Sequence, residues 1–394
     1  MTPGGLMYTF ERADIIEAAS EMIGIPSINP DLVENGEGES TLARAIASRL
    51  EQTEGIDVEL QEAADGRLNV IAAAGRGNGR TLMLNGHIDT VGVEGMADPF
   101  NPKVDGNRLH GRGSYDMKAA MGCATLLLEA IARDDNFPGR VVVTYVVDEE
   151  YASIGTEAVV RELHRWKPDA ALVLENSDLD ICVAHKGFAW AEIVTQGVAA
   201  HGSRYWLGVD AIAMMGYVQV ELDKLGASLL ERPPHRYLGP PSLHMGLIHG
   251  GQEISSYAAA CYLQLERRTI PGDTEESVEA EIEEILERLR RDDPEFSAMA
   301  TVGIVRNPFE VSEDEEIVKV LWDAAAEVRG EEPQFIGKAG WADSALLSEA
   351  GVPTAYFGPA GFGAHGAEEW VDIDSLERFL AILSRTAHEF CRGR

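Results

Sequence analysis

The segment Thr81–Met96, TLMLNGHIDTVGVEGM, decides how this sequence is interpreted. It begins as an apolar run typical of a buried strand and ends in a glycine-rich loop. His87 and Asp89 lie at the junction, two residues apart. Because alternate residues of a strand point to the same face, their side chains are expected on one side. The strand therefore presents an imidazole and a carboxylate together where it ends.

Amphipathic helices and apolar strands alternate around this segment. Apolar residues at helical spacing predict helices over 12–25, 40–53 and 117–135. The β-branched run of 139–150 and the apolar run of 169–176 are typical of strands covered on both faces. This alternation predicts an α/β fold with a mostly parallel sheet flanked by helices.

The pattern changes after residue 186. Mixed-face strands and amphipathic helices follow in the order β-α-β-β-α-β, which is that of a ferredoxin-like α+β unit. Beyond residue 306 the helices and strands of the first kind resume. We therefore predict an α/β domain in two parts, 1–186 and 307–394, interrupted by an inserted ferredoxin-like domain over 187–306.

Composition excludes several classes of protein. The 394 residues carry a net charge of −33, from 66 acidic and 33 basic residues, so the sequence predicts neither nucleic acid nor anionic membranes as partners. The acidic excess fits a salt-rich cytoplasm or an ordinary solvated surface. No apolar run approaches the roughly 18 residues of a membrane span, and the N-terminus shows no signal-peptide pattern. Four scattered cysteines predict reduced thiols in a cytoplasmic protein.

Polar residues at strand ends and loop starts could together hold metal. They are His87, Asp89, Asp116, Glu149, Glu150, Glu175 and His365. Ligands of open α/β sheets bind beyond the carboxyl ends of strands, so we expect these side chains to converge. So many acids in one place cost free energy unless cations compensate them. Nitrogen and oxygen donors without thiolate suit zinc, cobalt or manganese. His87 can bind the ion while Asp89 accepts its second ring N–H.

Eight motifs cover nearly the whole chain: NGHIDTV, GRGSYDMKAA, VVDEE, ALVLEN, GVAAHGS, ERRTIPGDT, GWADSALLSEAGVPTAYFGP and GAHGAEEWV. In this order they resemble those of the dinuclear-zinc amidohydrolases that include acetylornithine deacetylase, succinyl-diaminopimelate desuccinylase, aminoacylase and glutamate carboxypeptidase. The resemblance implies a zinc-exopeptidase-like catalytic domain, an inserted lid domain and homodimers that form through the lids.

The resemblance also implies roles for single residues. The implied metal ligands are His87 and Glu175 for one ion, Glu150 and His365 for the other, and Asp116 as the bridge. Glu149 would stay off the metals as general base, and Asp89 would orient His87.

The lid domain would contribute two further residues. His201 would polarise the scissile carbonyl, in its own subunit or in the partner's, and Arg268 would bind a substrate carboxylate. Arg267 is expected to face the opposite way. Ser255 stands where many relatives have asparagine, and Ala119 replaces a usual glycine.

The chemistry of amide hydrolysis explains this set of residues. Two metal ions can generate hydroxide near neutral pH and polarise the carbonyl, while a free carboxylate moves the proton to the leaving amine. We predict a metal-dependent hydrolase of N-acyl amino acids or small peptides that carry a free carboxylate, of the deacetylase or desuccinylase kind. The alternatives are an exopeptidase or dipeptidase of the same family and, more remotely, a non-catalytic α/β protein with a structural metal. Zinc is the expected ion, with cobalt and manganese as alternatives.

Overall fold

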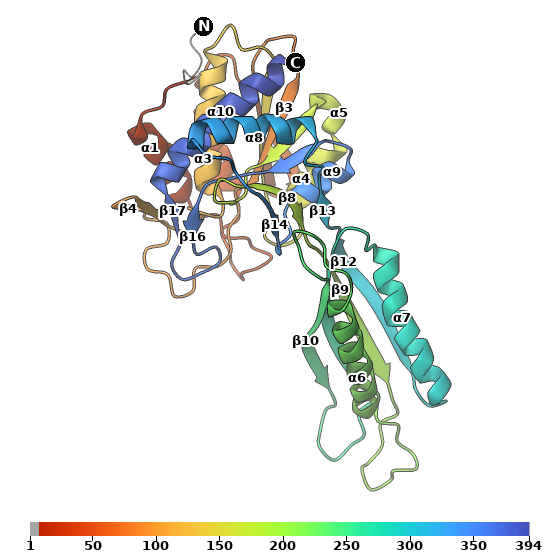
Figure 1. Ribbon diagram of the computed structural model, residues 1–394. Helices are drawn as coiled ribbons and strands as arrows, with labels where there is room; N and C mark the ends of the chain where they lie inside the picture. The colour runs from red at the N-terminus through yellow and green to blue at the C-terminus, as the bar shows by residue number, and fades with distance from the viewer. Residues whose placement is uncertain (1–7, 394) are drawn as a thin grey trace. The chain divides into compact units, whose positions relative to one another are not determined.

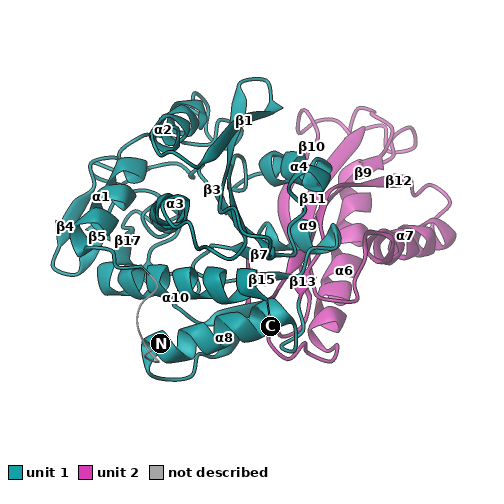
Figure 2. Ribbon diagram, turned by 90° about the horizontal axis from the view of Figure 1, so that it is seen from above, with its two compact units in different colours: residues 1–183, 311–336, 342–394 teal, residues 184–310, 337–341 magenta. Residues whose placement is uncertain are grey.

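The computed structural model describes residues 8–393. Residues 1–7, the first part of the N-terminus in which no signal peptide is predicted, lie outside the described residues. The chain forms two compact units (Figure 2). Unit 1 holds 1–183, 311–336 and 342–394, and unit 2 holds 184–310 and 337–341.

The main sheet runs in the order β1-β2-β6-β3-β7-β15-β8-β13, with β14 also paired to β8. Its strands are β1 (Asp57–Ala64), β2 (Arg67–Ala74), β3 (Thr81–His87), β6 (Arg140–Val146), β7 (Ala170–Val173), β8 (Ile181–His185), β13 (Phe309–Glu310), β14 (Phe335–Lys338) and β15 (Thr354–Tyr356). The central strands β6, β3, β7 and β15 are parallel to their neighbours in this group.

The strands added at the edges are antiparallel. β1 and β2 pair as a hairpin, and β2 joins β6 in the antiparallel sense. A connection as short as that between β1 and β2 permits antiparallel pairing, whereas parallel strands need a long crossover. The parallel centre confirms the predicted fold class, and the hairpin accounts for the antiparallel edge.

Helices cover both faces of this sheet (Figure 1). They are α1 (Arg12–Ile23), α2 (Ser40–Leu50), α3 (Lys118–Ala132), α4 (Ile154–Arg161), α5 (Leu163–Trp166), α8 (Glu316–Arg329), α9 (Ser344–Glu349) and α10 (Ile373–Arg392). On one face α3 packs against β6, where Thr125 meets Tyr145. On the other face Val159 of α4 and Leu347 of α9 pack over Val142. Burial on both faces explains why the central strands are apolar throughout.

A small sheet lies beside the main one in unit 1. Its strands are β4 (Lys103–Asp105), β5 (Arg108–His110), β16 (Gly361–Phe362) and β17 (Trp370–Asp372), in the order β16-β17-β5-β4. Trp370 of β17 pairs with His110 of β5. This pairing places the loop that follows β5 beside the loop that joins β16 to β17.

Unit 2 has the predicted β-α-β-β-α-β order. Its elements are β9 (Gly187–Gln196), α6 (Ala211–Leu230), β10 (Ser242–Gly250), β11 (Ala260–Thr269), α7 (Glu275–Asp292) and β12 (Ala298–Arg306). The antiparallel sheet runs β10-β11-β9-β12. Helices α6 and α7 pack on one face of it around a core that includes Ile193, Met215 and Ile282 (Figure 1). Within residues 8–393 no helix is long and apolar enough to cross a membrane.

Candidate metal centre

The carboxyl ends of three neighbouring strands meet at one edge of the main sheet. His87 ends β3 and lies opposite Val146, the last residue of β6. β7 pairs with the other side of β3 and ends at Val173, two residues before Glu175. Because the strands are parallel, their following loops leave from the same edge. Glu149 and Glu150 come from the loop after β6.

The imidazole of His87 is buried among carboxylates. Its Nε2 lies 3.2 Å from Glu175 Oε1 and 3.3 Å from Asp116 Oδ1. Its Nδ1 lies 3.1 Å from the carbonyl oxygen and 3.4 Å from the carboxylate Oδ1 of Asp89. The two Asp89 oxygens beside Nδ1 orient the ring so that Nε2 faces Asp116 and Glu175.

A second group forms around Asp116 and involves loops from distant parts of the sequence. Asp116 comes just before α3, and His365 lies between β16 and β17. His365 Nε2 is 2.8 Å from Glu150 Oε2 and 3.4 Å from Asp116 Oδ2. Asp116 therefore has one oxygen toward His87 and the other toward His365.

Two sets of three residues have ligand atoms within 4.8 Å of one another: His87, Asp116 and Glu150, and His87, Glu149 and Glu175. The structure thus brings together every unit 1 residue that the sequence singled out.

The crowded charges perturb one another strongly. Burial raises the pKa of Glu149 well above its usual value, and burial together with the charge of Asp116 raises that of Glu150 to about 7. Hydrogen bonds to Asp116 and Glu150 raise the pKa of His365 to about 10. Burial opposes protonation of His87, but the charge of Glu175 and its hydrogen bonds hold its pKa well above the usual value.

Asp89 is buried and does more than contact His87. Its carboxylate accepts hydrogen bonds from the backbone N–H groups of Glu149 and Glu150, each at 3.2 Å. It also accepts a 2.8 Å bond from Asn29 Nδ2, which in turn donates to Asp148. Asp89 therefore orients both the imidazole and the loop that carries the two glutamates.

Asp343 is a buried carboxylate that the sequence reasoning did not single out. Burial raises its pKa to about 7, and its charge raises the pKa of Glu149. An aspartate just before a helix usually caps it, but Asp343 makes no cap bond to α9. It accepts a 2.6 Å hydrogen bond from Thr156 Oγ1 instead. The missing cap bond is a tertiary feature, so the sequence offers no signal for it.

The donor set fits a divalent cation. It consists of imidazole nitrogens and carboxylate oxygens, which suit zinc, cobalt or manganese. The four cysteines are buried free thiols elsewhere in the chain. The carboxyl groups whose pKa values are raised by burial and mutual repulsion would be relieved by positive charge.

The two candidates from unit 2 are less enclosed. His201 is exposed, and its Nδ1 lies 2.8 Å from Ser203 Oγ. Its backbone forms an isolated bridge to Ser256, the residue that follows Ser255. These contacts hold the loop and leave the outer part of the imidazole accessible.

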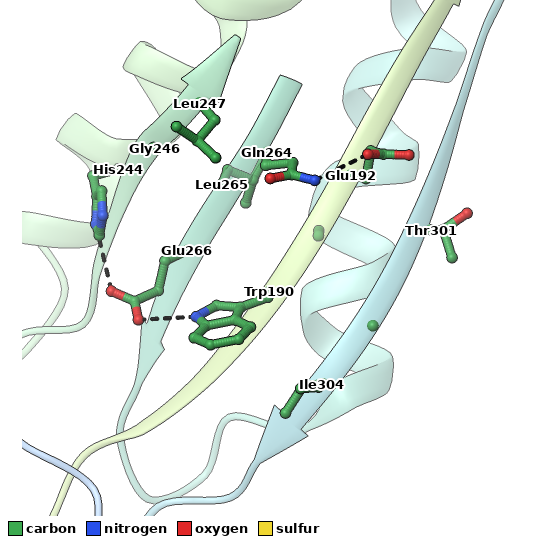
Figure 3. A pocket seen from close by; sticks show the side chains of 12 residues that line it. Trp190, Glu192, His244, Gly246, Leu247, Gln264, Leu265, Glu266, Thr301 and Ile304 are labelled. Carbon is green, nitrogen blue, oxygen red and sulfur yellow. Dashed lines mark hydrogen bonds and ion pairs between the residues drawn. The ribbon is translucent and has the colours of Figure 1, made fainter. Parts of the chain in front are cut away.

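Arg267 and Arg268 have different surroundings. Arg267 is fully buried and pairs with Asp273 and Glu281. Arg268 keeps 31% of its side chain exposed, and its NH2 lies 3.0 Å from Glu266 Oε1. Glu266 also accepts a 3.1 Å hydrogen bond from the Trp190 indole. Both residues line a groove of about 590 Å³ on the open sheet face (Figure 3). Arg268 is therefore the arginine that a ligand can reach.

The peptidase family M20/M25/M40 matches residues 83–389. The chain belongs to this family. Acetylornithine deacetylase of Myxococcus xanthus is 29% identical over 341 residues, which are 85% of this chain and 87% of the relative.

Solved structures of the family have a similar fold. A metallo-carboxypeptidase of family M20 from Sulfolobus solfataricus matches with a TM-score of 0.77 at 17% identity, over 97% of this chain and 99% of that one. A dinuclear metal binding M20 peptidase from Bacillus subtilis matches with a TM-score of 0.68 at 18% identity, over 95% and 97% of the two chains. The chain is a metal-dependent amidohydrolase of the M20 family, as the ordered motifs predict.

Proposed function

We propose that the protein hydrolyses the amide bond of N-acyl amino acids with two divalent ions, zinc in the first place. The observation that supports this most is that His87, Glu175, Asp116, Glu150 and His365 converge with Asp116 in the middle. His87 and Glu175 would hold one ion, Glu150 and His365 the other, and Asp116 both. When bound, the ions would activate water near neutral pH and polarise the amide carbonyl.

Glu149 is the proposed general base. It lies with His87 and Glu175, and its backbone N–H is held by Asp89. As a carboxylate beside the ions and not bound to them, it would accept the proton that the attacking water loses. Glu149 would then pass this proton to the departing nitrogen, which leaves as an amine. Asp89 keeps the imidazole of His87 in the tautomer that presents Nε2.

Arg268 is the proposed anchor for the substrate carboxylate. A guanidinium can bind a carboxylate through two parallel charge-assisted hydrogen bonds. Phe188 stacks below this guanidinium, with the Arg268 Cζ 5.4 Å from the ring centre, which limits its movement. His201 would polarise the scissile carbonyl as a hydrogen-bond donor.

Deacylation is favoured over peptide hydrolysis because the similar curated sequences are acetylornithine deacetylases over most of the chain. Exopeptidase activity is the second candidate, since solved structures with a similar fold include a metallo-carboxypeptidase and an aminopeptidase. The test is a screen of N-acetyl and N-succinyl amino acids against dipeptides, with the zinc-loaded enzyme and a free-amine assay. We expect the highest kcat/KM for an N-acyl amino acid. A dipeptide turned over faster than every acyl compound would refute deacylation.

We propose a homodimer that forms through unit 2. Helix α6 exposes Ile212, Tyr217 and Val220, and the adjacent edge strand β10 exposes Ile248 on the sheet face that the helix covers. An apolar stripe beside an unpaired strand edge suits a two-fold interface with a second copy. Ile248→Lys should yield monomers in light scattering. Met299→Lys, on the opposite edge strand β12, is the matched control and should stay dimeric.

We also infer a reducing compartment, the cytoplasm. Cys123, Cys182, Cys261 and Cys391 are all buried free thiols. Disulfides persist in oxidising compartments, so four cysteines that form no disulfide suit a reducing one.

A further inference from the structure

A buried ion pair lies behind the proposed ligands Asp116 and His365. The carboxylate of Glu369 is fully buried and contacts the guanidinium of Arg112 at 2.6 Å, which is itself only 3% exposed. Glu369 also accepts backbone N–H bonds from Gly113 at 3.1 Å, Tyr115 at 2.9 Å and Asp116 at 3.1 Å. One carboxylate thus holds the backbone of the loop that ends at Asp116.

Arg112 extends the same connection to two other loops. Its NH2 donates to the carbonyl of Gly366 at 2.8 Å, next to His365 in the chain. Its Nε donates to the carbonyl of Gly92 at 3.1 Å, in the loop that follows His87 and Asp89. The planar guanidinium suits this task because it has several donors in a fixed arrangement.

His365 depends on such a support more than His87 does. The His87 side chain is fully buried at a strand end, whereas that of His365 is 57% exposed in a loop. The φ angle of His365 is 62°, a left-handed conformation that few residues other than glycine adopt. Little packing surrounds this imidazole, so the bonds of its loop decide where it lies.

We propose that Arg112 and Glu369 are positioning residues that hold Asp116 and His365 together for the second metal ion. This inference rests on the proposed dinuclear site. A buried ion pair is weak evidence for stability, since apolar residues of similar size often stabilise a protein equally well. Both partners of this pair bind backbone groups beside two proposed ligands. The pair therefore serves to fix the geometry of the site.

The experiment is a metal titration by calorimetry, with the absorption spectrum of bound Co²⁺ as a second readout. The variants are Glu369→Gln, which removes the charge, and Arg112→Lys, which keeps the charge but lacks the planar fork. Loss of such outer partners weakens metal binding about 10–100-fold. We expect this loss for the second ion, because the loops of both Asp116 and His365 depend on the pair. The first ion shares only Asp116 with these loops, so it should weaken clearly less, and the spectrum of the second site should change. The control Glu368→Gln changes the exposed neighbouring glutamate and should bind both ions as the wild type does.

A double variant separates positioning from stability. Arg112→Met combined with Glu369→Leu should restore the melting temperature of the metal-free protein relative to Glu369→Gln, but not the affinity for the second ion. Recovery of both properties would overturn the inference, as would equal weakening of both ions. If both single variants bind two ions as the wild type does, the inference about Arg112 and Glu369 is wrong, whereas the dinuclear site still stands. A wild type that takes up one ion would overturn the dinuclear proposal and this inference with it.

Discussion

The candidate residues of unit 1 and those of unit 2 differ in how far their own surroundings indicate a role for them. His87, Asp89 and Glu175 are buried and contact one another or the same partners. His201 is exposed, and Arg268 keeps a third of its surface open. A buried cluster of acids is unfavourable without a cation, so the cluster points to a cation site without reference to unit 2. An exposed histidine is stable without any ligand, so only its action on a substrate can give it a role.

The largest expected effect tests the assignment of roles inside unit 1. Glu149→Ala should lower kcat by at least about 10²–10⁴-fold because the general base is lost. Its metal content should stay at the wild-type level, whereas Glu150→Ala should lose metal as well. Elemental analysis and turnover of the purified variants provide the measurement. The reverse pattern would mean that the base and the ligand are exchanged.

The next largest effect tests whether His201 of unit 2 serves the active site of its own subunit or that of the partner. Glu149→Ala and His201→Ala chains should each be nearly inactive. If His201 serves the partner's site, mixed dimers contain one intact site, and random reassociation should restore about a quarter of wild-type activity. Light scattering must confirm the dimer. Mixing that restores nothing would place His201 in the site of its own chain.

A smaller effect is expected at Arg268. Arg268→Lys keeps the charge but loses the bidentate geometry, so KM for an N-acyl amino acid should rise about tenfold. The corresponding N-acyl amino-acid amide, which lacks the carboxylate, serves as the control substrate and should be affected much less. Steady-state kinetics with both substrates decide the question. Equal losses would make Arg268 a structural residue like Arg267.

The smallest effect concerns the pH dependence of stability. The raised pKa values of Glu150, about 7, and His365, about 10, mean that the folded state retains protons that the unfolded chain releases. Stability of the metal-free protein should therefore fall as pH rises from about 5 toward 10. Metal ions replace these protons, so the zinc-loaded protein should show a flatter dependence. Thermal unfolding across this range, with and without zinc, is the measurement. Parallel curves would argue against metal binding by these groups.

The sequence by itself determined the fold class and the positions at which chemistry could be sought. The apolar runs that end at His87 and before Glu149 and Glu175 show both the strands and their carboxyl ends, because burial on two faces leaves a pattern that is local in sequence. The ordered motifs identified the family. The β-α-β-β-α-β order of unit 2 was also readable, since each element has its own periodicity.

Only the tertiary structure decided which distant groups share partners. Glu368 and Glu369 are adjacent and identical in type, yet one is exposed and the other accepts from Arg112 and three backbone N–H groups. Asp343 looks like a helix cap and contacts Thr156 instead. Such differences arise from hydrogen bonds and burial between segments far apart in the chain, which leave no periodic trace in the sequence.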